Sequence, residues 1–303
     1  MELIERIKNN FNKGFFDKAM LIEGLPAEYP AWTIKKSDWV GVAVPLNQTF
    51  TFSERFSNVK IRTAPGTEIN GEIHNLLLLT CEDMSLRNEF AVICSQFIQP
   101  GSDGKLREEL IAAPEKWWGH WKFLLGNVNS SHSAYPVLGE LIILENLLSD
   151  GKKAKWTGAD KATHDIELPH RSYEVKSTTK RYGYEVTISS VYQMKKSGET
   201  LDLVFCRFEP SSLGRSVNDL VESLVQAGYS EKELEASLQK QNLERGCTAR
   251  NTRFKLLEMR VFPVDDEFPA VTCDSFVGGV LPKCVTEFSY TLDLSGVTSK
   301  KTL

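Results

Sequence analysis

Glu174 and Lys176 stand two residues apart in the segment Tyr-Glu-Val-Lys at 173–176, which has the alternation of a β-strand. Alternate side chains of a strand share a face, so Glu174 and Lys176 point the same way while Tyr173 and Val175 point into apolar packing. A carboxylate and an ammonium group are thereby directed at one place. On a strand such a pair usually forms an exposed ion pair, and beside further acidic groups it favours a reactive site.

Asp165 supplies a second carboxylate upstream of this segment. The residues at 169–171 are typical of a turn, so we expect the strand that holds Asp165 to lie antiparallel beside the strand of Glu174. Two carboxylates that share a face repel each other unless a cation lies between them. Mg²⁺ is the expected cation, with Mn²⁺ as a substitute, because Mg²⁺ binds through one or two carboxylates together with waters and substrate phosphate.

Glu140 is a third acidic candidate, on a helix that the pattern predicts over 135–148. Its neighbours at helical offsets are apolar, namely Val137, Ile143, Leu144 and Leu147. Burial of an unpaired carboxylate costs on the order of several kcal/mol, so a group inside the fold is expected to use this charge.

The charge of the chain is uneven around these candidates. The 303 residues include 36 Lys and Arg and 40 Asp and Glu, for a net charge of −4. Residues 151–196 nevertheless contain ten Lys and Arg against five Asp and Glu, so one basic segment lies in an acidic protein. Each candidate alone has an ordinary structural explanation. Their occurrence together in a basic stretch favours a metal site.

The composition, with 41% hydrophobic and 25% charged residues, is that of an ordinary globular chain. The longest apolar run, around 76–79, is far shorter than the roughly 18 residues of a membrane-spanning helix, and residues 1–16 lack the apolar stretch of a signal peptide. We therefore expect a cytoplasmic protein with no membrane segment. None of the six cysteines forms a Cys-x-x-Cys pair, which predicts reduced, mostly buried thiols and no zinc site.

The candidates require a framework of helices and strands, which hydrophobic periodicity and turn residues predict. Around the candidates we expect a helix at 135–148, strands at 155–157, 163–168, 172–177 and 184–189, a short helix at 190–196 and a buried strand at 201–208. Before them we expect helices at 2–22 and 84–97, one or two helices over 106–125, and an antiparallel sheet of strands at 40–46, 49–52, 59–63 and 72–80. After them we expect helices at 216–227 and 230–241 and strands at 254–263 and 286–294. The order predicts an α/β fold whose core consists of a helix, a mixed central sheet, a helix and a strand. We expect this core at 127–210, an N-terminal α+β domain at 1–126 and a C-terminal α+β extension at 211–303.

In this order, Glu140, Asp165 and the Glu174-x-Lys176 pair resemble the PD-(D/E)XK nuclease superfamily. More narrowly, the sequence is similar to a bacterial family known by its PD-(D/E)XK motif and found near restriction and phage-defence genes. The segments that carry this likeness are Leu-Gly-Glu-Leu at 138–141, Trp-Thr-Gly at 156–158, His-Asp-Ile at 164–166, Tyr-Glu-Val-Lys-Ser-Thr at 173–178, and Ile-Ser-Ser at 188–190 with Gln193. The likeness covers roughly residues 117–294. Ala159 stands where that family usually has a proline, and no proline precedes Asp165; neither departure affects a ligand.

The resemblance implies a restriction-endonuclease-like core and a role for each candidate. Asp165, Glu174 and the backbone carbonyl of Val175 would hold the metal, and Glu140 would support a second ion or its waters. Lys176 would orient or deprotonate the attacking water. We therefore predict a Mg²⁺-dependent endodeoxyribonuclease of a restriction or anti-phage defence system, with DNA as its partner.

Two interpretations remain open for several other residues. Ser190 and Gln193 have the spacing of a helix capping box, and the resemblance places Gln193 near the active site. The basic residues Lys180, Arg181, Lys195 and Lys196 belong to a solvated face or contact DNA phosphates. His164 is expected to pack on the face opposite Asp165, and the tryptophans Trp117, Trp118 and Trp121 are expected to form a buried seam.

The rival function is a catalytically silent subunit that keeps the fold and binds DNA or other defence proteins. The acidic remainder of the chain partly fits this rival, because it weakens autonomous DNA binding. Retention of all four site residues argues against it. Cleavage of both strands requires a homodimer or repeated events, and the sequence leaves both open.

Overall fold

The computed structural model describes residues 2–13, 16–124, 134–160, 163–196 and 200–300. The chain divides into two compact units. One comprises Met1–Ser131 with Arg245–Thr248, and the other comprises His132–Glu244 with Ala249–Leu303. Seven α-helices and three sheets lie in the described residues, so the chain has a mixed α/β fold.

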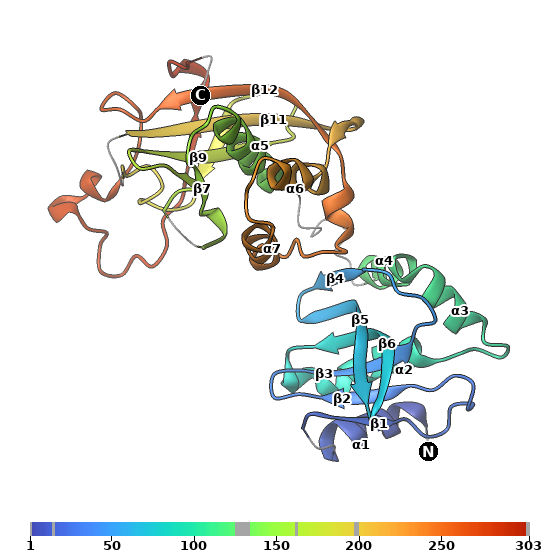
Figure 1. The fold of residues 1–303 in the computed structure, drawn as a ribbon. Helices are drawn as coiled ribbons and strands as arrows, with labels where there is room; N and C mark the ends of the chain where they lie inside the picture. Colours follow the sequence, from blue (N-terminus) through green and yellow to red (C-terminus); the bar gives the residue numbers. More distant parts are fainter. Residues whose placement is uncertain (1, 14–15, 125–133, 161–162, 197–199, 301–303) are drawn as a thin grey trace. The chain divides into compact units, whose positions relative to one another are not determined.

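The first unit contains a six-stranded antiparallel sheet (Figure 1). Its strand order is β1-β2-β3-β6-β5-β4, with β1 at Lys18–Leu21, β2 at Trp32–Lys35, β3 at Val40–Pro45, β4 at Ser53–Phe56, β5 at Val59–Ile69 and β6 at Glu72–Cys81. The predicted strands near 40, 59 and 72 are confirmed. The strand predicted at 49–52 is wrong, because β4 begins only at Ser53. The helix predicted over 2–22 ends at Lys13, and β1 occupies its last part.

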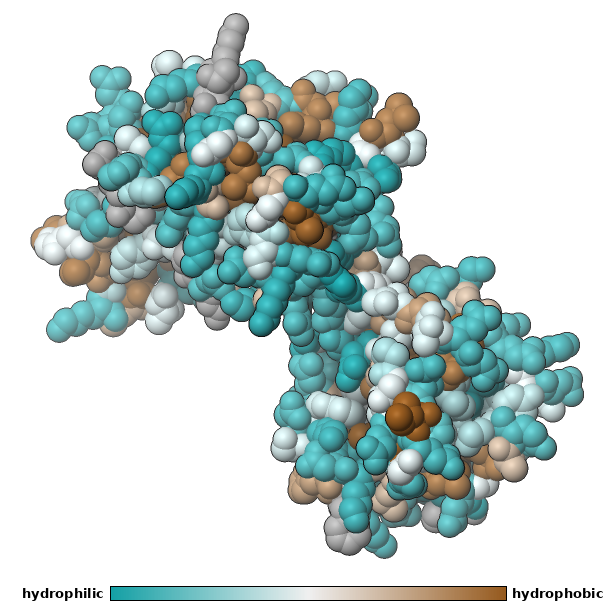
Figure 2. Space-filling view, viewed as in Figure 1, coloured by the Kyte–Doolittle hydropathy of each residue, from teal (hydrophilic) through white to brown (hydrophobic). Residues whose placement is uncertain are grey.

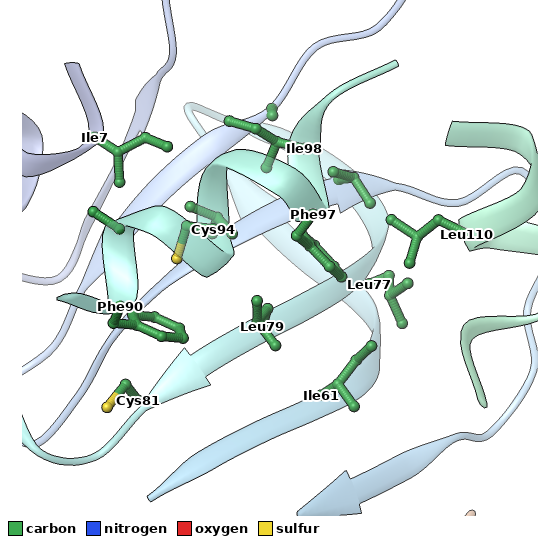
Figure 3. Close-up of a cluster of buried hydrophobic side chains, with 14 of the residues drawn as sticks. Ile7, Ile61, Leu77, Leu79, Cys81, Phe90, Cys94, Phe97, Ile98 and Leu110 are labelled. Atoms are coloured by element: carbon green, nitrogen blue, oxygen red, sulfur yellow. The ribbon is translucent and has the colours of Figure 1, made fainter. Parts of the chain in front are cut away.

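Four helices accompany this sheet, α1 at Leu3–Lys13, α2 at Arg87–Ile98, α3 at Lys105–Ala112 and α4 at Pro114–Leu124. The apolar face of α2 packs on β6, where Phe90, Cys94 and Phe97 meet Leu77 and Leu79 in a buried cluster (Figure 3). The predicted helical stretch at 106–125 consists of two helices, because a proline begins the second one and proline is suited to the first turn of a helix.

The tryptophans of α4 differ in burial. Trp118 is buried, whereas Trp117 and Trp121 are half-buried and line a cavity of about 660 Å³ with Phe97. The predicted buried seam is therefore correct for Trp118 alone.

The second unit contains a five-stranded mixed sheet in the order β12-β11-β9-β8-β7. The strands are β7 at Lys155–Trp156, β8 at Ile166–Glu167, β9 at Arg171–Thr178, β11 at Thr200–Arg215 and β12 at Phe254–Pro263. β9 and β11 are parallel, and the other neighbours are antiparallel. The remaining strands, β10 at Glu185–Ile188 and β13 at Tyr290–Asp293, form a separate antiparallel pair. Because β12 pairs with β11, residues from both sides of the predicted boundary at 210 share one sheet; the three-domain division stays a prediction.

Three helices belong to this unit, α5 at Tyr135–Ser149, α6 at Val217–Gln226 and α7 at Glu231–Lys240 (Figure 1). α5 lies directly on β9, since a Cβ at Gly139 would come within 2.3 Å of the Ser177 hydroxyl and 3.3 Å of Val175. Glycine is therefore required for this close approach. Arg215, at the end of β11, forms a bidentate ion pair with Glu145 of α5.

The short helix predicted at 190–196 is wrong, because the described part of this segment forms turns. The Ser190 hydroxyl accepts from the Tyr192 N–H, and the Gln193 side chain accepts from the Ser189 N–H at 2.7 Å. The side chains thus satisfy local backbone donors as a cap does, and no helix follows. We call residues 189–194 the Gln193 turn.

All six cysteines lie in described residues, none of them is in a disulfide bond, and five are buried, as predicted. Within the described ranges no helix is long and apolar enough to span a membrane. The viewed face is mostly hydrophilic, with hydrophobic residues scattered over it (Figure 2).

Candidate active site

Helix α5 holds Glu140 among apolar side chains. The residue is only 8% exposed, and Val137, Ile143 and Leu144 around it are also buried. The Trp156 indole N–H donates to Glu140 Oε2 at 2.6 Å, and Gln241, at the end of α7, forms a second hydrogen bond with the carboxylate. The described ion pairs include no basic partner for Glu140. The buried carboxylate is thus held by neutral donors.

Strands β8 and β9 bring Asp165 and Glu174 together. Ile166 pairs with Tyr173 in antiparallel register, and the same register continued by one residue puts Asp165 opposite Glu174. The Asp165 Oδ2 atom accepts from the Val175 N–H at 2.7 Å, which fixes the orientation of the carboxylate. The turn predicted between the two strands therefore returns the chain as expected.

Lys176 completes a chain of polar contacts on this strand. Its Nζ lies 2.8 Å from Glu174 Oε1 and donates to Gln193 Oε1 at 3.4 Å. The Glu174 side chain is 2% exposed and the Lys176 side chain 18% exposed. Gln193 therefore both stabilises its own turn and contacts the ammonium group of Lys176. Its two predicted roles, as a capping residue and as a residue near the active site, are compatible.

Gly158 keeps a space open between two of the carboxylates. A Cβ at this position would lie 2.8 Å from Glu140 Oε2 and 2.9 Å from Asp165 Oδ1, too close for either contact. The backbone of the same segment is fixed, because the N–H groups of Thr157 and Gly158 donate to the Asp165 carbonyl at 2.8 and 3.0 Å. One oxygen of Glu140 and one oxygen of Asp165 thus face a space that stays open only because residue 158 is glycine.

The three carboxylates resist ionisation. Burial raises the pKa of Glu140 well above its ordinary value, and the neighbouring Asp165 charge raises it further. Burial also raises the pKa of Asp165, against the effects of the Val175 N–H and the Lys176 charge. The pKa of Glu174 is raised to about 8, first by burial and then by Asp165, with Lys176 opposing the shift. A bound cation would favour all three ionised forms.

A family model described as "Putative PD-(D/E)XK family member, (DUF4420)" matches residues 31–295. The chain belongs to this family. No curated protein and no solved structure matches the chain. The resemblance seen in the sequence is thereby confirmed at the level of the PD-(D/E)XK superfamily, whose members are mostly nucleases that use divalent metals.

The donors at this candidate site fit a hard divalent cation that is held in part by water. Oxygen ligands from two carboxylates suit Mg²⁺, and the space beside Gly158 lies between two such oxygens. Within the described residues, however, no group of three or more His, Cys, Asp or Glu side chains is arranged to hold a metal ion. An ion in the space beside Gly158 would take ligands from the Glu140 and Asp165 carboxylates, and water and phosphate would supply the others.

The other predicted basic residues of this PD-(D/E)XK chain have different neighbours. Lys180 lies 3.3 Å from Glu185, Lys195 contacts Cys273 and Asp274, and Lys196 lies 3.9 Å from Asp266. Arg181 is exposed. Among the contacts that the structure describes, none connects these four side chains to Glu140, Asp165 or Glu174. Their assignment as DNA contacts stays a prediction.

His164 is buried, as predicted, and hydrogen-bonds the backbone of Gln193 and Lys195. It thus connects the Asp165 segment to the Gln193 turn. The sequence did not single out Trp156, Gly158 or Gln241 for their contacts with Glu140. The Trp-Thr-Gly motif was a signal for the first two, whereas nothing in the sequence indicated Gln241.

Proposed function

We propose that this PD-(D/E)XK protein is a Mg²⁺-dependent endodeoxyribonuclease of a bacterial restriction or anti-phage defence system. The observation that carries the proposal is the arrangement of Asp165 opposite Glu174, with Lys176 beside Glu174 and Glu140 near Asp165 across the space at Gly158. Location in the cytoplasm and association with defence proteins or with a second copy belong to the same proposal.

Each side chain has a distinct task in this proposal. Asp165 and Glu174, with the Val175 carbonyl, would hold Mg²⁺, and Glu140 would hold a second ion or its waters. When bound, the metal supplies Lewis-acid polarisation of the phosphate and of water. Asp165 is suited to its task because the Val175 N–H occupies Oδ2 and leaves Oδ1 directed at the space beside Gly158.

Lys176 would orient the attacking water. Its ammonium group has three donors, of which the described contacts with Glu174 and Gln193 use two. The third donor is then available to a water or a phosphate oxygen. Hydrolysis proceeds by in-line attack of water on phosphorus, and the family resemblance implies a 5′-phosphate and a 3′-hydroxyl as products.

The test is incubation of the full chain with supercoiled plasmid DNA in Mg²⁺, Mn²⁺ or chelator. We expect nicked and linear products only with metal, and none from Glu174→Gln or Lys176→Met. Glu209→Gln and Lys255→Met are matched controls, because both residues are exposed on β11 and β12 of the same sheet. Wild-type activity in both site variants would refute the assignment.

One observation favours the catalytically silent alternative, namely the lack of a three-ligand metal group in the described residues. A silent subunit would bind DNA or a defence protein with no turnover. Binding of labelled DNA without cleavage in either metal would select this alternative.

A further inference from the structure

Arg207 is a buried arginine whose guanidinium group is occupied by protein contacts. It is 6% exposed, and its Nη1 and Nη2 donate to the carbonyls of Lys180 and Gly183 at 2.5 and 2.6 Å. Its Nε donates to Glu258 Oε2 at 3.2 Å. The group also lies 5.1 Å from the Tyr184 ring centre. Arg207 therefore has little capacity left for an external ligand.

These contacts join Arg207 to the loop that follows β9. The β9–β10 loop, residues 179–184, connects the end of β9 to the start of β10. One guanidinium group bridges two of its carbonyls, and Tyr184 at its end donates to Glu258 at 3.0 Å. A buried arginine is favourable only when its donors are satisfied, so the loop and Arg207 depend on each other.

The fixed loop displays cationic and aromatic side chains. Lys180 and Arg181 are exposed, and the Tyr182 side chain is 81% exposed. A hollow of about 470 Å³, lined in part by Tyr182 and Leu257, lies beside them. A large exposed ring on a fixed support, with a hollow beside it, suits a binding surface.

The loop follows directly from the strand of the candidate site. Thr178 pairs with Arg207 in the parallel register of β9 and β11, so Arg207 shares the sheet face of Lys176. Lys180 lies two residues beyond the end of β9, and its N–H donates to the Thr178 hydroxyl at 3.1 Å, so the loop begins next to the strand of the candidate site.

We propose that the β9–β10 loop contacts DNA beside the cleaved phosphate, with Tyr182 in the groove or against a base and Lys180 and Arg181 on flanking phosphates. Arg207 is the positioning residue that holds this loop. The identity of the ligand as DNA rests on the proposed function. Two cations beside an exposed aromatic ring favour nucleic acid, because the cations match phosphates and the ring matches bases.

The test measures binding of a fluorescein-labelled duplex of about three helical turns to the full chain, by anisotropy in chelator. Tyr182→Ala should weaken binding about tenfold, whereas Tyr182→Phe should stay within about twofold, because it keeps the ring. Leu213→Ala is the matched control, since Leu213 is 90% exposed on β11 of the same unit. It should leave binding unchanged.

Arg207→Lys tests the positioning role, because lysine keeps the charge and loses the fork that bridges two carbonyls. It should also weaken binding about tenfold. The double variant with Tyr182→Ala should then be little weaker than either single variant, because both changes remove the same contact. Additive losses would contradict the positioning role, and Tyr182→Ala alone tests the loop if Arg207→Lys does not fold.

The outcomes separate this inference from the proposed function. If the wild type binds and cleaves DNA and Tyr182→Ala binds equally well, the loop inference is overturned and the nuclease stands. If the wild type binds without cleavage and Tyr182→Ala loses binding, the loop inference is supported and the catalytic proposal fails. If the wild type binds no DNA, both are overturned.

Discussion

The indole N–H of Trp156 donates to the Glu140 carboxylate at 2.6 Å in the interior of the second unit. A neutral donor at this position stabilises the ionised acid only partly, because burial and Asp165 still raise its pKa well above the ordinary range. A glutamine has nearly the same shape as the protonated acid and can accept the same hydrogen bond.

Glu140→Gln should therefore leave the unfolding free energy in chelator unchanged or higher, and should abolish cleavage in Mg²⁺. Urea denaturation and the plasmid assay measure the two effects. Loss of about 3 kcal/mol or more in chelator, with cleavage retained, would instead indicate a structural ion pair at Glu140.

The stability of the metal-free protein should fall as pH rises from about 4.5 to about 8. The pKa of Glu174 is about 8 in the folded state, above its ordinary 4.5, so the unfolded chain releases the proton first and ionisation favours unfolding within this window. Each pH unit costs up to about 1.4 kcal/mol for one such group. Urea midpoints across this range should fall less steeply for Glu174→Gln than for wild type or Glu209→Gln. Equal slopes would show that Glu174 titrates normally.

Gly158→Ala should weaken Mg²⁺ binding by about tenfold or more without removal of any ligand, because the methyl group would occupy the space between the Glu140 and Asp165 oxygens. Calorimetric titration measures the affinity. Asp165→Asn, which removes a charge, should weaken binding as well. Gly296→Ala is the matched control, since nothing lies within 4 Å of its Cβ position. Unaltered affinity in Gly158→Ala would show that no bound ion occupies the space between Glu140 and Asp165.

DNA affinity should depend steeply on salt, and neutralisation of Lys180, Arg181, Lys195 and Lys196 should reduce that dependence. Each lost phosphate contact lowers the slope of log affinity against log salt by about 0.9. Lys180, Lys195 and Lys196 already lie near the carboxylates of Glu185, Asp274 and Asp266, so Arg181→Gln should account for most of the change. A slope unaffected by all four changes would put the DNA path on another surface.

Local spacing was sufficient to predict part of this site. The two-residue period of a strand put Glu174 and Lys176 on one face, and the turn at 169–171 put Asp165 on the neighbouring strand, as the register now shows. These relationships depend only on residues close together in the chain.

Contacts between distant segments were not predictable in the same way. Gln241 reaches Glu140 from the end of α7, about a hundred residues later, and no pattern in either segment indicates the other. In the segment at 190–196 the local sequence signal was present but did not determine the structure. Its capping residues are present and make their local bonds, but such bonds also stabilise turns, so the predicted helix did not form.

The pairing of β12 with β11 has a practical consequence for work on fragments. A fragment that ended at residue 210 would keep the site strands and lose the whole of β12, so the outer edge of β11 would expose backbone donors and acceptors from Asp202 onwards. Such an edge, lined by buried apolar side chains such as Val204 and Phe208, recruits strands from other molecules. A fragment of this kind would aggregate, and its inactivity would say nothing about the chemistry of the intact chain.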